Sequence, residues 1–350
     1  MKVRILLCVL VSMVAMHQSF VHAEERDDTT PLLVMFWNLE NFFDYVDSGA
    51  GDSDTEFSPQ GQRRWTRSRF YTKCNAVSKA ILWIADNRGR IPDVICMAEV
   101  ENLFVVKSIA RSPVLRKYGY AAVHYDSPDH RGIDVALMYR KEIFEELSSR
   151  PCRIYDRDSI LLHTRDILCV SLKDRRNGVC TSFLVNHHPS KFGGAEASEG
   201  RRRIAMETLK PVCDSIFCEE GPEAGIVATG DFNDTPSGGL FGVLCGEGSA
   251  AGGPCMAGRM VNLGDTVEES GQGTIRYKGK WELIDMFVVS ETMSEEGVME
   301  VVKVPFLMAR DNTHVGEKPF RTYSGPRYIG GVSDHCPIIF ECKDMSAISH

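Results

Sequence analysis

The 350-residue chain is 43% hydrophobic and 25% charged, the composition of an ordinary globular protein, with room for one large α/β domain or two smaller ones. Its formal net charge of −8 argues against a protein that coats nucleic acid, because such proteins are basic. The charge does not exclude a nuclease whose acidic side chains hold a metal ion.

The N-terminus has the pattern of a cleaved secretory signal over residues 1–23. Lys2 and Arg4 precede an apolar stretch, and small residues stand at positions −3 and −1 before Glu24. A membrane anchor is disfavoured because the apolar stretch is short for a bilayer. We expect a secreted or periplasmic protein without stable membrane association, with a flexible segment over residues 24–31. The signal holds two of the 40 basic residues and none of the 48 acidic ones, so the mature chain would carry −10.

Several predicted strands end in polar side chains. The apolar strand over residues 32–37 runs into Asn38, and the strand over residues 92–99 ends in the carboxylate of Glu99. A predicted hairpin ends in Asn186-His187-His188. The other expected strands cover residues 119–124, 133–139, 167–172, 181–185, 283–290 and 336–341.

Three predicted helices alternate with these strands. The first has Phe70, Val77, Ile81 and Ile84 at helical spacing, the second begins after Asn102, and the third covers residues 196–216. The first and third carry clusters of arginine, which either solvate a helix surface or meet a phosphate. Gly-rich stretches over residues 44–61 and 238–273 are expected to be loops, the second around a short helix. Without an internal repeat or linker, this order predicts one layered α/β domain over residues 32–345.

The stretch from Ile226 to Pro236 joins a buried strand to a carboxylate and an amide. Asp231 and Asn233 are two residues apart, so on an extended backbone they point to the same side. Such a pair can hold a divalent cation, or a water beside a phosphate. Alone, the stretch reads as an ordinary turn, but the polar ends of the other strands favour a functional site.

The cysteines suggest a mixture of buried thiols and disulfides. Without Cys8 in the signal, 11 cysteines remain, and no Cys-x-x-Cys spacing indicates zinc. The candidate disulfides are Cys245–Cys255 and Cys213–Cys218. Buried thiols are expected at Cys96, Cys169, Cys180 and Cys336.

Five short motifs occur in a specific order along the chain. They are Asn38-Leu-Glu-Asn41, Ala98-Glu99-Val-Glu101, Gly230-Asp-Phe-Asn233, Leu283-Ile-Asp285 and Ser333-Asp-His335. In this order they resemble the motifs of the endonuclease/exonuclease/phosphatase superfamily, the deoxyribonuclease-I-like metal-dependent phosphoesterases, with Ala98 in place of a glutamine. The resemblance runs from Asn38 to the last strand. It implies a four-layer α/β sandwich, in which two mixed β-sheets pack face to face with helices on the outer faces.

The resemblance also implies a metal site. Glu99 would be the first ligand of Mg²⁺ or Mn²⁺, with Ca²⁺ as a further candidate. Asn38 would steady the metal or its water, and Asp334 would be a second ligand or orient a base. The alternative is that Glu99 has a purely structural role as a carboxylate near the N-terminus of a helix. That role suits Glu101 better than Glu99.

The remaining motif residues would carry the chemistry. By resemblance, Asp231 would position or deprotonate the attacking water, and Asn233 would hold a phosphate oxygen. His335 would contact the phosphate or act as general base, oriented by Asp285. Asp285 lies in an apolar run, where a carboxylate without a partner would be costly.

The motifs leave the roles of two further positions open. The family usually has one histidine at the strand end occupied by His187 and His188, and we favour His187. It would add a cation near the phosphate or an acid for the leaving oxygen. Arg131-Gly132-Ile-Asp134 resembles the family's mid-chain turn and strand, and a catalytic role of Asp134 is doubtful.

The leading expectation is a metal-dependent phosphodiesterase, in first place a monomeric endonuclease acting on nucleic acid. The alternative is the same chemistry on a small phosphoester, such as a nucleotide, an inositol phosphate or a phospholipid head group. A metal-free binding module of the same fold is disfavoured, because every motif acid and the motif histidine are intact.

Overall fold

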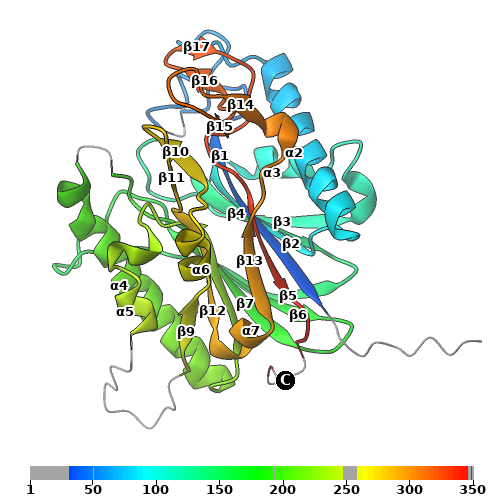
Figure 1. The fold of residues 1–350 in the computed structure, drawn as a ribbon, viewed down its shortest axis with the longest axis vertical. Coiled ribbons are helices and arrows are strands. Elements are labelled where there is room, and N and C mark those ends of the chain that lie inside the picture. The colour runs from blue at the N-terminus through cyan, green and yellow to red at the C-terminus, as the bar shows by residue number, and fades with distance from the viewer. Residues whose placement is uncertain (1–30, 50, 192–193, 247–257, 346–347, 349–350) are drawn as a thin grey trace, which may run out of the picture.

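Alternate residues of the first strand, β1 (Leu32–Phe42), pack into two different hydrophobic cores. Val34 and Phe36 belong to the core that includes the second sheet, and Met35 and Trp37 belong to the core under the N-terminal helices. Burial on both faces explains why residues 32–37 of β1 are an unbroken apolar run. The computed structural model describes residues 31–49, 51–191, 194–246, 258–345 and 348, and places β1 inside a layered molecule (Figure 1).

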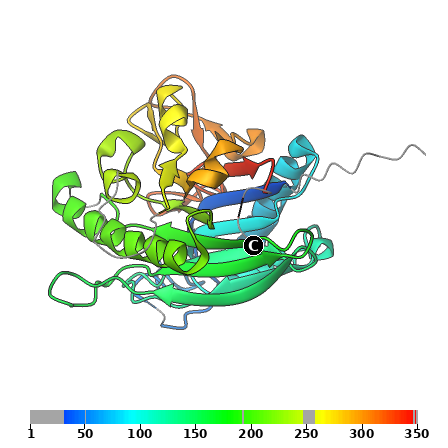
Figure 2. The same cartoon turned by 90° about the horizontal axis from the view of Figure 1, so that it is seen from below.

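Two six-stranded sheets pack face to face, as Figure 2 shows from below. Each is mixed, because β1–β2 and β7–β8 are parallel pairs and the other pairs are antiparallel. This arrangement confirms the predicted α/β sandwich. The first sheet has the order β13 (Gly297–Val301), β18 (Ile338–Cys342), β1, β2 (Val94–Val100), β4 (Asp134–Arg140), β3 (Tyr120–His124). The second has the order β5 (Phe144–Cys152), β6 (Ile167–Asp174), β7 (Cys180–His187), β8 (Gly225–Asp231), β12 (Asp285–Ser290), β9 (Met260–Asn262).

Helices cover the outer faces of the two sheets. α2 (Arg67–Arg88) and α3 (Leu103–Ala110) pack on the first sheet, and α4 (Ala195–Glu220) runs along the second. The side chain of Asn102 accepts from two backbone N–H groups of α3, which explains why this helix begins there. The shorter helices are α5 (Gly242–Cys245), α6 (Gly264–Glu269), α7 (Glu291–Glu295), η1 (Arg116–Tyr118), η2 (Pro236–Gly238) and η3 (Pro305–Leu307). Three small hairpins complete the fold: β10 (Ile275–Tyr277) with β11 (Lys280–Glu282), β14 (Met308–Arg310) with β15 (Glu317–Pro319), and β16 (Tyr323–Ser324) with β17 (Arg327–Tyr328).

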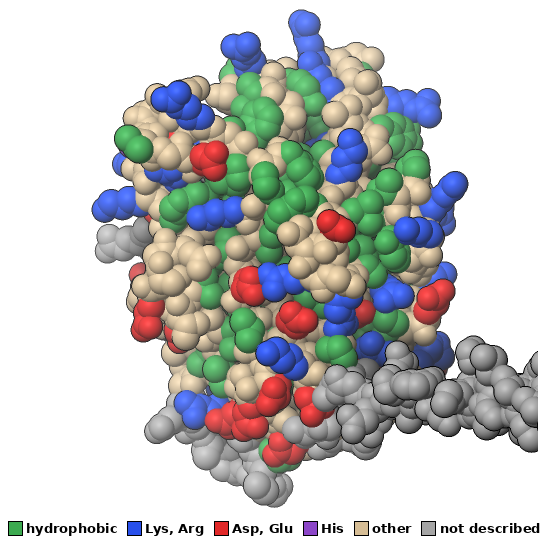
Figure 3. Space-filling view, turned by 45° about the vertical axis from the view of Figure 1, so that its right-hand side comes forward, with side chains coloured by type: hydrophobic (Ala, Val, Ile, Leu, Met, Phe, Trp, Pro, Cys, Tyr) green, Lys and Arg blue, Asp and Glu red, His purple; other side chains and the backbone are tan. Residues whose placement is uncertain are grey.

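The basic residues around the start of α2 serve the structure. Arg63 forms an ion pair with Glu56, and Arg69 donates to the backbone oxygens of Arg63 and Arg64. Lys73 is buried and donates to the backbone oxygen of Glu40. On the side of the molecule where α2 lies, Lys and Arg side chains are spread out, and Asp and Glu gather most densely at the lower end (Figure 3). These contacts favour the structural interpretation of the first arginine cluster.

Both predicted disulfides are wrong. Cys213 and Cys245 are free thiols, whereas Cys218 is disulfide-bonded. Cys213 is buried within α4, and Cys245 is partly exposed. Spacing along the chain did not reveal which sulfur atoms the fold brings together. Of the expected buried thiols, Cys180 is partly exposed.

The predicted signal over residues 1–23 and the segment 24–30 lie outside the described residues. Among the helices of the described ranges, none combines the length and apolar character needed to cross a membrane.

Candidate active site

The register of the two sheets gathers the motif residues at one edge of the sandwich. In the second sheet, Asp231 on β8 stands opposite His187 on β7 and Asp285 on β12. In the first sheet, Asn38 on β1 pairs with Ala98, so Glu99 on β2 follows directly. Side chains from five strands or strand ends therefore converge without any one segment carrying the site.

A local irregularity in β2 directs the Glu99 carboxylate into this group. Glu99 has a left-handed φ of 59°, and the pairing of β2 shifts between Ala98 and Val100. A left-handed residue other than glycine costs free energy and occurs where surrounding contacts hold it. Here the Asn41 N–H donates to Glu99 Oε2 at 2.7 Å, and Asn38 Nδ2 donates to Oε1 at 3.4 Å.

Asp231 is the central carboxylate of the group. Its Oδ2 accepts from Asn38 Nδ2 at 3.0 Å and lies 3.7 Å from His187 Nε2 and 3.9 Å from His335 Nε2. Its Oδ1 accepts from the Asn233 N–H at 2.9 Å. Burial, and then the nearby Asp285 carboxylate, raise the pKa of Asp231 to about 7.

His335 and Asp285 form a buried pair, with 2.8 Å between Nδ1 and Oδ2. Burial alone lowers the pKa of His335, but the Asp285 carboxylate reverses this and holds that pKa well above its usual range. The imidazole is therefore charged at neutral pH and directs Nε2 toward Asp231. A buried carboxylate needs a partner, and the partner of Asp285 is His335.

Of the two adjacent histidines, His187 faces the catalytic carboxylates. Its Nε2 lies 3.8 Å from Glu99 Oε1, and burial and the nearby Arg165 guanidinium hold its pKa well below the usual range. His188 packs edge-on against Phe232 instead, and neither of its ring nitrogens has a hydrogen-bond partner within the described chain. Burial lowers the pKa of His188 to about 3.

The other predicted residues lie at the border of this group. Asn233 Nδ2 donates to the backbone oxygen of His188 at 3.0 Å. Asn38 Oδ1 accepts from the Glu40 N–H, so its amide nitrogen faces the carboxylates. Asp334 is the most exposed, and its Oδ2 accepts from Arg321 at 2.9 Å while Oδ1 lies 3.9 Å from His335 Nε2.

Comparison with known proteins decides the family. A sequence profile of the endonuclease/exonuclease/phosphatase family matches residues 33–344. The chain belongs to this family. It is accordingly a metal-dependent phosphoric ester hydrolase. No curated sequence is significantly similar to it.

Solved structures of this family share the fold with the chain at low sequence identity. A family member from Bacteroides thetaiotaomicron is 15% identical with a TM-score of 0.56, and the match covers 91% of this chain and 100% of that one. A mannosyl-6-phosphatase from the same organism is 15% identical with a TM-score of 0.54, covering 88% and 98%. D. rerio TDP2 in complex with a single-strand DNA product is 12% identical with a TM-score of 0.51, covering 89% and 98%.

Divalent-metal dependence is typical of the endonuclease/exonuclease/phosphatase family, and the donor set of this chain fits such an ion. Ligand atoms of Asp231, Asp285 and His335 lie within 4.8 Å of one another, and the Glu99 carboxylate adjoins them through His187. Asp285 Oδ1 is buried and has no hydrogen-bond partner among the described residues. Carboxylate oxygens gathered in this way are the ligands that Mg²⁺ and Mn²⁺ prefer.

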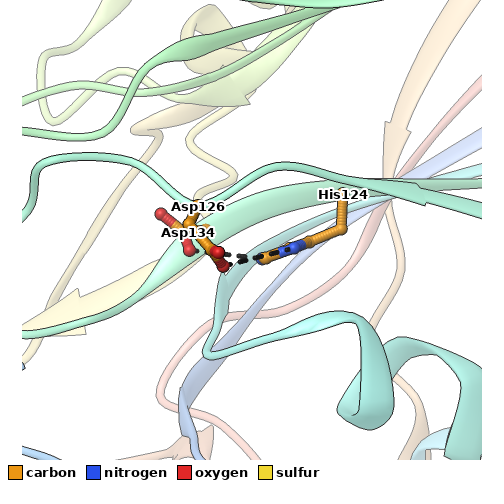
Figure 4. Close-up of side chains that lie close together, drawn as sticks. All are labelled: His124, Asp126 and Asp134. Carbon is orange, nitrogen blue, oxygen red and sulfur yellow. Dashed lines mark ion pairs between the residues drawn. The ribbon is translucent and has the colours of Figure 1, made fainter. Parts of the chain in front are cut away.

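Asp134 lies apart from this family site. It begins β4, and its Oδ2 is 3.2 Å from His124 Nε2 (Figure 4). Its Oδ1 accepts from the Ser127 N–H at 3.0 Å. Its contacts are thus within the β3–β4 hairpin, and none of them joins the catalytic group.

Two arginines of the site were missed by the sequence reasoning. Buried Arg165 donates to the backbone oxygens of His187 and His188 and to Asp129, and Arg131 approaches Glu99 Oε1 at 3.9 Å. Both line a cavity of about 430 Å³ beside the carboxylates, together with His130, His163 and Arg201 among others. A single arginine before an apolar strand is too common a pattern to mark Arg165, whereas Arg131 stood in a motif whose role was left open.

Proposed function

We propose that the protein is a divalent-metal-dependent phosphodiesterase that cleaves nucleic-acid phosphodiester bonds by attack of water, with Mg²⁺ or Mn²⁺ as its ion. The observation that carries the proposal is the position of Asp231, whose Oδ2 lies within 3.9 Å of Asn38, His187 and the His335–Asp285 pair. One acid, one neutral histidine and one charged histidine thus face one another, and these are groups that hydrolysis of a phosphodiester uses.

The metal would be held by the Glu99 carboxylate, which the Asn38 amide orients, with Asp334 as the second ligand. When bound, it would neutralise the negative charge of the phosphodiester. The same Asn38 amide donates to Glu99 and Asp231, so it fixes the separation of the two carboxylates.

The protonation state of each remaining side chain is consistent with its proposed role. Asp231, with a pKa of about 7, can accept a proton from the attacking water near neutral pH. Charged His335 donates a hydrogen bond to a phosphate oxygen, while Asp285 fixes its ring and stabilises its charge. Neutral His187 donates a hydrogen bond from its ring N–H to the leaving oxygen, and Asn233 holds the backbone of His188 in place.

The neighbouring cavity bears on the substrate. Arg131, Arg165 and Arg201 line it, and Asp129 is the one acidic residue among the described residues of its lining, so the lining is net positive in an acidic protein. A flanking phosphate of a nucleic acid suits such a surface. Its volume of about 430 Å³ also suits a small phosphoester, which is the second candidate substrate class.

Incubation of the protein with supercoiled plasmid, linear single strands and a panel of nucleotides, sugar phosphates and inositol phosphates tests the proposal. Each substrate is combined with Mg²⁺, Mn²⁺, Ca²⁺ or EDTA, and folded Asp231→Asn is the inactive control. Nicking or shortening of nucleic acid that EDTA abolishes is the expected result. Turnover of small phosphoesters alone would refute the nucleic-acid substrate and support the second candidate class. Absence of all turnover would refute the catalytic proposal.

A further inference from the structure

A second group of acidic side chains lies outside the catalytic centre. Asp134 begins β4 of the first sheet, and Asp166 directly precedes β6 of the second. Both line one small cavity of about 10 Å³, together with Ser127 and Tyr125 of the β3–β4 hairpin. A cavity of this size holds one particle as large as a water molecule.

Asp166 is an unusual carboxylate in this setting. The residue is 5% exposed, and within the described chain neither carboxylate oxygen has a hydrogen-bond partner. No ion pair within 4.0 Å joins it to any described basic residue, although Arg153 is near enough to lower its pKa. Burial raises the pKa of Asp166 to about 6. Buried carboxylate oxygens without a partner are costly and call for a cation or a donor in the cavity beside them.

Asp134 presents a carboxylate that is already held in place. Its Oδ1 accepts from both the N–H and the hydroxyl of Ser127, and its Oδ2 lies 3.2 Å from His124 Nε2. Ligand atoms of His124, Asp126 and Asp134 lie within 4.8 Å of one another, as Figure 4 shows for the three side chains. An imidazole that donates to a ligating carboxylate is the usual support of a metal ligand.

We propose that Asp134 and Asp166 together bind one hard divalent cation, Ca²⁺ in first place, in the cavity between the two sheets. The Ser127 hydroxyl supplies a neutral oxygen ligand, and His124 orients Asp134. Oxygen ligands from separate segments favour Ca²⁺ over Mg²⁺, because Ca²⁺ accepts flexible geometry and Mg²⁺ demands a near-ideal octahedron.

This site is independent of the catalytic metal and of the proposed nuclease activity. None of its members belongs to the group around Asp231, and its ligands come from β4, from the loop before β4 and from the residue before β6. A bound cation would therefore join the first sheet to the second. Its expected effect is on stability, since a ligand that binds only the folded chain raises the free energy of unfolding.

Terbium luminescence tests the site directly. Tb³⁺ replaces Ca²⁺ at oxygen sites and emits when a nearby tyrosine is excited, and Tyr125 lines this cavity. The full chain carries Glu99→Gln, so that the catalytic metal contributes little. In this background we expect tyrosine-excited Tb³⁺ emission that Ca²⁺ displaces more effectively than Mg²⁺.

Three further variants assign that emission. Adding Asp166→Asn should abolish it, whereas the matched change Asp158→Asn, at an exposed aspartate of the preceding loop, should leave it intact. Adding Tyr125→Phe should weaken the emission but keep the Ca²⁺ affinity. Emission that survives Asp166→Asn at full strength would overturn the proposal.

Thermal unfolding gives a readout that a merely structural aspartate would not produce. In the Glu99→Gln chain, Ca²⁺ should raise the unfolding midpoint. With Asp166→Asn added, the midpoint without Ca²⁺ should stay equal or rise, because a buried charge is removed, and Ca²⁺ should no longer shift it. Should that variant fail to fold, Ser127→Ala, which keeps the backbone donor, should weaken Ca²⁺ binding by about tenfold. A midpoint of the Glu99→Gln chain that is unaffected by Ca²⁺ would refute the site.

Discussion

Asp231, Asp285 and Glu99 are three carboxylates in one small volume, and each has a different neighbour. Asp285 contacts a charged imidazole, Asp231 lies between two histidines, and Glu99 is held by Asn41 and Asn38 at the outer side. The same charge removed from each should therefore have a different consequence.

At Glu99 the consequence should be a loss of metal affinity. Glu99→Gln keeps an acceptor for the Asn41 N–H but removes the charge, so activity should fall at limiting Mg²⁺ and recover in part at high Mg²⁺. Glu101→Gln is the matched control, because burial raises the pKa of Glu101 to about 8 and glutamine mimics its neutral form. Mg²⁺ titrations of activity for both variants decide the matter, and an unchanged Mg²⁺ dependence of Glu99→Gln would make Glu99 a purely structural group.

His335 and Asp285 should act as a unit. Loss of one positioned acid–base group lowers turnover by ~10²–10⁴, so His335→Ala should reach this range. Adding Asp285→Asn should cost little more, whereas adding Asp231→Asn should lower turnover further. Turnover of one diester at saturating Mg²⁺, with circular dichroism as the folding control, is measured for His335→Ala, Asp285→Asn and the two double variants. Fully additive losses for His335 and Asp285 would contradict the pairing seen in the structure.

His188 should make the protein sensitive to acid. The unfolded chain binds a proton at this histidine near pH 6.5, but the folded chain does so only near pH 3, because burial lowers the pKa. Stability is therefore lost as the pH falls below about 6.5, by about 2 kcal/mol at pH 5. Urea unfolding at pH 7 and pH 5 should show a smaller loss for His188→Leu than for the wild type. His130→Leu, at an exposed ring, is the control, and an unchanged pH slope in His188→Leu would contradict the prediction.

At the scale of elements, the site depends on how closely β7 and β8 approach. A Cβ on Gly230 would lie 2.1 Å from the backbone oxygen of Asn186, which is closer than real contacts allow. Gly230→Ala should therefore separate the two strands, destabilise the fold by ~2 kcal/mol or more and lower activity. Gly200→Ala in α4, where a Cβ meets nothing within 4 Å, should be neutral or stabilising. Denaturant midpoints compare the two, and equal midpoints would show that β7 and β8 tolerate the added methyl.

The elements that sequence patterns predicted are those buried on at least one side. The hairpin of β6 and β7 and the start of α3 follow from apolar runs and from the cap at Asn102. β5 was missed because it is an edge strand, buried only at its ends, so its polar residues carry no alternation. The Gly-rich stretch over residues 238–273, expected to form loops around a short helix, contains the short helices α5 and α6 and the strand β9 in its described part.

For the site, the motifs predicted which residues would matter but not how each would be oriented. The preference for His187 agrees with its position, yet only the fold shows that His188 packs on Phe232. Arg165 could not be predicted, because two of its contacts are with backbone oxygens and the third is with the distant Asp129, and neither kind has a sequence signature. The disulfide predictions failed because spacing along the chain does not show which sulfur atoms the fold brings together.

At the scale of the molecule, we propose that the chain is exported and matures near Glu24. The pattern of residues 1–23 motivates this, and it makes the mature protein more acidic than the full chain. Mass spectrometry of the protein from its natural cells should find an N-terminus close to Glu24. A folded cellular product that retains Met1 would contradict export. Sedimentation of the same sample tests the expected monomer.

The pairing of Asp231 with Asp285 on one side and His187 on the other has a consequence for anyone who handles the protein after denaturation. In a strand, a slip by one residue sends each side chain to the opposite face. A molecule refolded with β8 out of register could keep its secondary structure and much of its compactness but would have no assembled site. The specific activity recovered on refolding should therefore reflect only molecules with the correct strand register. It should rise more slowly than the circular-dichroism signal of secondary structure.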